Sequence, residues 1–160
     1  MSVLASLQRF IRNPKPNYGQ AVQSLRLLFA LMFMGQLLIV AVSGSIFLLF
    51  VQRASGTSPL IAQILVLFAI MQVPVALGVA TMSARKGYKG GALAGVISLA
   101  VILASPAWYA LLLWLMGSSG FYLLLLLLVL TLAYGLGFEQ SGIYAKLAIQ
   151  IPEPQRDKEA

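Results

Sequence analysis

Four long apolar runs, joined by short polar loops, constrain this chain more than any other feature. The runs cover residues 25–51, 59–82, 91–117 and 121–138. About 20 apolar residues in a helix cross the hydrocarbon core of a bilayer. Backbone groups in lipid must bond within their own segment, which favours helices. The runs therefore predict four transmembrane helices, and the short loops predict that consecutive helices are antiparallel.

The composition supports a membrane protein over a soluble one. Of the 160 residues, 60% are hydrophobic and only 9% are charged, with a mean hydropathy of +0.91. Soluble domains carry roughly 25% charged residues. A water-soluble fold of this size does not bury so much apolar surface. We predict an all-α membrane protein, an up-down bundle of four transmembrane helices, with residues 21–150 as one domain.

The two ends of the chain differ from the four runs. Apolar residues recur at helical spacing near the N-terminus, at Val3, Leu4, Leu7, Phe10 and Ile11. This spacing predicts an amphipathic helix within residues 1–20, lying on the cytoplasmic membrane surface. Docking of this helix on a partner protein is the alternative. Residues 151–160, "IPEPQRDKEA", are charged and contain proline, which predicts a flexible cytoplasmic tail.

The basic residues predict the orientation. Of the 11 lysines and arginines, only Arg53 falls in a loop on the opposite side from the other ten. Short cytoplasmic loops carry an excess of Lys and Arg, so both termini and the middle loop are predicted to be cytoplasmic. We expect a bacterial inner (plasma) membrane, with anionic lipids as partners on the cytoplasmic side.

The residue types present leave little for catalysis. The chain contains no cysteine and no histidine, and Glu139 is its only acidic residue before the tail. Thiol nucleophiles, most transition-metal sites and the commonest general base are thereby excluded. One carboxylate cannot form an acid–base pair. We expect no enzyme activity, no cofactor, no metal and no nucleic-acid partner.

Glu139 is the first candidate functional residue. It follows Phe121 by 18 residues, and helical rise then places it near the inner membrane boundary. An acid at this depth reaches headgroups and water at small cost. We predict an interfacial ion pair with Arg85 or Lys86 of the middle loop. A contact to a partner subunit and a role in ion transport are the alternatives.

Two amides lie deeper. Gln36 and Gln72 both fall near mid-membrane by helical rise. We predict that both face the interior of the bundle, where they can bond to each other and link their helices. A substrate site is the alternative interpretation.

Small residues and prolines mark the packing. Gly87, Gly91 and Gly95 are spaced four apart, so they share one helix face. This spacing predicts a helix-packing face, used either within the chain or between chains. Pro74 and Pro106 lie inside the second and third runs, where each is expected to kink its helix.

These observations favour a non-catalytic structural or accessory subunit of a larger inner-membrane complex, such as a respiratory, photosynthetic or transport assembly. Its expected partners are other membrane protein subunits. The alternative is a small homo-oligomeric transporter or channel, in which several copies build one pathway.

Overall fold

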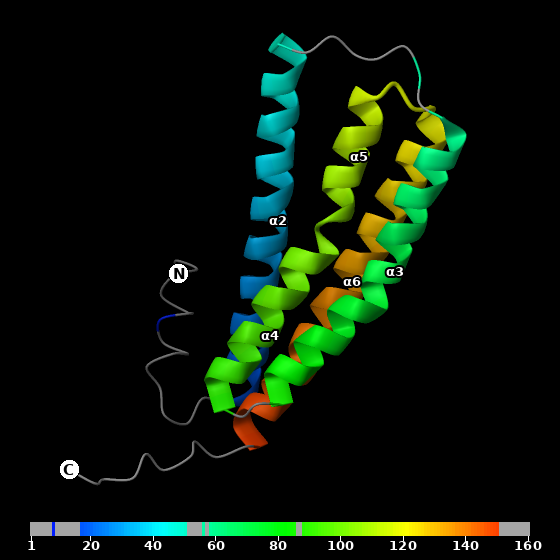
Figure 1. The fold of residues 1–160 in the computed structure, drawn as a ribbon. Helices are drawn as coiled ribbons and strands as arrows, with labels where there is room; N and C mark the ends of the chain where they lie inside the picture. The colour runs from blue at the N-terminus through cyan, green and yellow to red at the C-terminus, as the bar shows by residue number, and fades with distance from the viewer. Residues whose placement is uncertain (1–7, 9–16, 51–55, 57, 86–87, 151–160) are drawn as a thin grey trace, which may run out of the picture.

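The computed structural model of the chain describes residues 8, 17–50, 56, 58–85 and 88–150 (Figure 1). The described residues between 17 and 150 form helices, turns and loops, and none of them forms a strand. Their helices are α2 (Tyr18–Phe50), α3 (Pro59–Arg85), α4 (Tyr88–Leu103), α5 (Pro106–Leu115) and α6 (Gly120–Gln150). The amphipathic helix predicted within residues 1–20 and the tail predicted at 151–160 lie almost entirely outside the described residues.

Four helical segments are long and apolar enough to cross a membrane, which confirms the predicted all-α four-helix bundle. They are Tyr18–Phe47, Pro59–Arg85, Gly90–Leu115 and Gly120–Ile149, and the third combines α4 with α5. The chain is therefore a multi-pass integral membrane protein.

Two helices are longer than the apolar runs that predict them. Helix α2 begins at Tyr18, seven residues before the first run, and α6 continues to Gln150. The added part of α6 keeps a buried face, formed by Ser141, Tyr144, Ala145 and Ala148. This spacing is helical, so packing against the bundle extends the helix where hydropathy has already fallen.

Helix α2 packs less extensively on α5 than on α4 and α6. Helix α2 packs mainly on α6 and α4, and α3 packs on α4 and α6. In Figure 1, the lower part of α2 lies beside α4. Its upper part meets the side chain of Leu111 in α5, whose Cδ1 would lie 3.0 Å from a Cβ added to Gly44. The outward side chains of upper α2 are mostly apolar, and Phe50 is 81% exposed. Such a surface suits lipid or another membrane protein.

An aromatic cluster fills the centre of the contact between α2 and α6. Phe29 and Phe33 are buried, and the ring of Phe33 lies 5.3 Å from that of Tyr134, edge to face. The Phe29 ring lies directly on Gly137, where an added Cβ would overlap it. The absence of a side chain at Gly137 therefore allows this contact.

Small side chains form the contact between α3 and α4. The buried face of α3 consists entirely of alanines, namely Ala62, Ala69, Ala76, Ala80 and Ala84. A Cβ added to Gly95 would lie 2.7 Å from the backbone oxygen of Ala80, and one added to Gly91 would lie 2.8 Å from that of Ser83. Gly91 and Gly95 thus pack within the chain, whereas Gly87 lies outside the described residues.

The two interior prolines have different effects. Pro74 lies on an exposed face of α3, which continues without a break from Pro59 to Arg85. Pro106 instead begins α5, and Ala104 and Ser105 form a turn after α4. The third membrane span is therefore broken near its middle, as Figure 1 shows between α4 and α5.

The turn between α5 and α6 is set by Gly117. The Ser118 N–H donates to the carbonyl of Leu113 at 2.9 Å, and the Gly117 N–H donates to that of Trp114 at 3.1 Å. Gly117 has a φ of 73°, a left-handed value that favours glycine. This pair of bonds is a Schellman motif, which ends α5 and allows α6 to start at Gly120.

Candidate functional site

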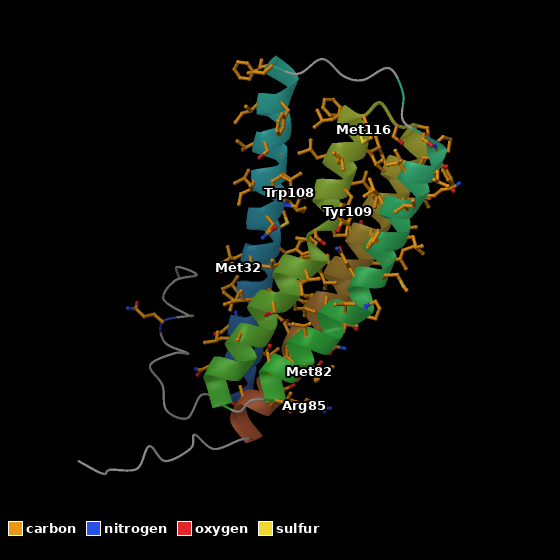
Figure 2. The ribbon with its side chains drawn as sticks, in the orientation of Figure 1. Met32, Met82, Arg85, Trp108, Tyr109 and Met116 are labelled. Carbon is orange, nitrogen blue, oxygen red and sulfur yellow. The ribbon has the colours of Figure 1, made fainter. Side chains whose placement is uncertain are left out.

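Glu139 lies on the outside of the bundle. It is exposed on α6, as is Arg85 at the lower end of α3 (Figure 2). No ion pair joins these two side chains among the described residues. Lys86, the other predicted partner, lies outside that part of the chain, so a pair with Lys86 stays a prediction.

The rotation of α6 explains this separation. Tyr144 of α6 shares a hydrogen bond of 3.1 Å with Thr81, one turn before Arg85, so the Tyr144 face of α6 points toward α3. Five residues correspond to about 140° of rotation around a helix. Glu139 therefore points away from α3 and from Arg85. Lys146, which is exposed, lies on nearly the same face as Glu139.

Gln72 is the centre of a polar cluster in the middle of the bundle. Its Nε2 donates to the hydroxyl of Tyr109, and its Oε1 accepts from the hydroxyl of Ser105. The amide of α3 is thus bonded to the turn before α5 and to α5 itself. Both partners differ from Gln36, which was the predicted partner.

Ser105 also compensates for the proline that follows it. Its hydroxyl lies 2.6 Å from the carbonyl oxygen of Ile102, and its backbone N–H donates to the same oxygen at 3.2 Å. Pro106 has no N–H to donate to that carbonyl, so Ser105 supplies the bond instead. A hydroxyl has one proton, and the two acceptors of Ser105 share it.

Gln36 is half-buried on α2 and has no hydrogen-bond partner among the described residues. Ser43 lies two turns later on the same side of α2 and is likewise half-buried without a bond in the described part of the chain. An amide in hydrocarbon without a partner carries a cost in free energy. This face of α2 is therefore suited to receive a polar group from outside the chain.

The sequence analysis did not identify Ser105 and Tyr109 as partners of Gln72. Tyr109 follows Ser105 by four residues, so both lie on one helix face. A serine directly before a proline in a membrane span is the signal that identifies a hydroxyl-supported break. Arg26 is the third missed residue, and its surroundings are described below.

The described residues include no group of three or more His, Cys, Asp or Glu side chains that could hold a metal ion. Comparison with protein-family models, with curated proteins and with solved structures found no match. What the chain does must therefore be inferred from its own geometry.

Proposed function

We propose that this chain is a non-catalytic structural or accessory subunit of a larger membrane protein complex, in a bacterial inner membrane with both termini in the cytoplasm. The observation that carries the proposal is the Gln36 amide. It lies near the middle of the longest helix and has no partner among the described residues.

A mid-membrane amide without a partner favours association with another helix. Hydrogen bonds between membrane helices contribute about 0.6–2 kcal/mol. Met32 and Ile39 flank Gln36 on α2, and both are exposed and apolar. An unlike subunit whose helix carries one polar group among apolar side chains would match this face. A bond from that group to Gln36 would fix how far the two helices are shifted along each other.

The other polar groups at this depth support the same proposal. Gln72 bonds to both Ser105 and Tyr109, which holds α3 to the broken third span. They are occupied in packing, which suits a structural role better than solute binding within one chain.

Site-directed cross-linking tests the proposal directly. The chain has no cysteine, so Ile39→Cys creates a single attachment point beside Gln36. A thiol-linked benzophenone there should capture an unlike membrane protein in native membranes. Leu67→Cys, on the exposed face of α3, serves as the matched control. No adduct above that control would contradict the proposal.

A second test removes the amide itself. Gln36→Leu should lower the amount of unlike subunit that co-purifies in mild detergent, because the interhelical bond is lost. Gln63→Leu, an equal change at an exposed position of α3, should leave co-purification unchanged. Equal yields from both variants would remove Gln36 from the interface.

A homo-oligomeric transporter or channel is the second candidate, because Gln36 and Ser43 place two polar groups on one side of α2. Several copies would then share a pathway lined by these groups. The Ile39→Cys adduct would in that case contain only this chain. Solute flux in vesicles that depends on Gln36 would favour this candidate over the first.

A further inference from the structure

Arg26 is a cation that packs against α6 and forms no ion pair with any described residue. Its guanidinium carbon lies 4.8 Å from the centroid of the Phe138 ring. The Nε atom is buried and has no hydrogen-bond partner among the described residues. Arginine is an obligate donor with five N–H groups, and it stays charged in proteins. The Nη groups are not buried in this way and also bond to no described residue, so an acceptor for them has to come from outside the described residues.

The packing of Arg26 is specific. A Cβ added to Gly142 would lie 3.4 Å from both Nε and Nη2 of Arg26, so the guanidinium lies over the bare backbone of α6 at this glycine. Phe138 is one turn earlier on the same helix. The cation–π contact and the glycine together hold the planar group in one orientation.

A groove of about 690 Å³ opens beside this guanidinium, lined mostly by α2 and by Phe138 of α6. The part of the lining that α2 forms is polar near the start of the helix and apolar further along it. Tyr18 and Gln23 contribute polar groups toward the start of the helix, whereas Leu27 and Ala30 are apolar and lie further along it.

The membrane boundary falls between these two parts. Arg26 contacts Phe138, which directly precedes Glu139 on α6. Helical rise from Phe121 to Glu139 covers about 27 Å of a hydrocarbon core of about 30 Å, which places the inner boundary near these residues. Tyr18, Gln23 and Arg26 then lie at headgroup depth, and Ala30 lies at acyl-chain depth.

We propose that this groove binds one anionic phospholipid of the inner leaflet, with its phosphate on Arg26 and an acyl chain along Leu27 and Ala30. A guanidinium matches phosphate through parallel N–H···O bonds. Among the described residues, no acidic side chain lines the groove to receive the amine of a zwitterionic headgroup. The occupant is therefore an anionic lipid rather than a zwitterionic one.

Native mass spectrometry of the 160-residue chain tests this binding. The chain in detergent is titrated with phosphatidylglycerol or with phosphatidylcholine, and the bound lipids are counted. One phosphatidylglycerol should be retained in preference to phosphatidylcholine. Arg26→Gln should weaken that retention about tenfold or more, because charge-assisted bonds to the phosphate are lost. Equal retention of the two lipids would overturn the proposal. So would equal retention of phosphatidylglycerol by Arg26→Gln and by the unsubstituted chain.

Two further variants separate the site from general effects of charge and folding. Arg85→Gln makes the same change in charge at an exposed position of α3 and should keep the lipid; an equal loss there would overturn the proposal. Ala30→Trp fills the apolar part of the groove and leaves Arg26 in place, so it should also reduce retention. Retention unchanged by Ala30→Trp would contradict the placement of the acyl chain.

Inorganic phosphate serves as the competitor that distinguishes a lipid from a free anion. Phosphate at millimolar concentration should not displace phosphatidylglycerol, because it lacks the acyl chain that contacts Leu27 and Ala30. Complete displacement would show a free-anion site and overturn the proposal.

Discussion

Gly135 and Gly137 lie close together on α6, but only one of them is packed against another helix. A Cβ added to Gly135 meets no atom within 4 Å, whereas one added to Gly137 overlaps the ring of Phe29. Phe29 cannot easily move, because it is buried and packs on Phe33 with ring centroids 5.6 Å apart. Only Gly137 is therefore required for close packing.

We expect Gly137→Ala to lower the free energy of unfolding by about 1–3 kcal/mol, the usual cost of overpacking a core. Gly135→Ala should be neutral or slightly stabilising, because alanine favours a helix over glycine. Unfolding in mixed detergent micelles, followed by circular dichroism, measures both. Equal losses for the two variants would contradict the packing of Phe29 on Gly137.

Among the helices, α3 and α4 approach most closely through small residues. The alanine face of α3 and the two glycines of α4 bring backbone next to backbone. Dispersion contacts then extend along the helices without large side chains between them. This contact needs no partner chain.

Gly95→Ala should therefore push α3 and α4 apart. Its Cβ would lie 2.7 Å from a backbone oxygen of α3, which cannot rotate away as a side chain can. We expect a loss of about 1–3 kcal/mol. Gly78→Ala, which meets no atom within 4 Å, is the matched control, and thermal unfolding of the two purified variants should separate them by several degrees.

The break between α4 and α5 depends on Ser105. The Ser105 hydroxyl bonds both to Gln72 and to the carbonyl that Pro106 leaves without a donor. We expect Ser105→Ala to cost about 0.6–2 kcal/mol. Ser45→Ala, which removes an exposed hydroxyl bonded only to Ala41 of its own helix, should cost less than about 0.5 kcal/mol. Equal unfolding free energies for the two variants would show that Ser105 does not stabilise the break.

For the bundle as a whole, the direction of insertion is the main prediction that remains. The absence of cysteine allows single thiols to be placed at each end. In intact bacteria, Ser58→Cys should react with a membrane-impermeant maleimide, whereas Arg85→Cys should react only after permeabilisation, because basic loops stay in the cytoplasm. The reverse labelling pattern would invert the topology.

Hydropathy predicted much of this architecture. The four spans, their alternation and their approximate ends follow from the apolar runs, since transfer of a segment into lipid depends mainly on its own residues. The glycine spacing at Gly91 and Gly95 likewise predicted a packing face. The extensions of α2 and α6 were not predicted, because packing rather than hydropathy keeps them helical.

The polar contacts were not predictable in the same way. Gln72 was recognised as a mid-membrane amide, but its partners depend on the break at Pro106, which turns Ser105 and Tyr109 toward α3. Glu139 was predicted to pair with Arg85 or Lys86, but the rotation of α6 points it away from Arg85. Sequence alone determined that this chain crosses the membrane four times, because burial in lipid is a local property. Only the tertiary structure decided which polar groups meet, because helix rotation is set by the small residues over which distant helices make contact.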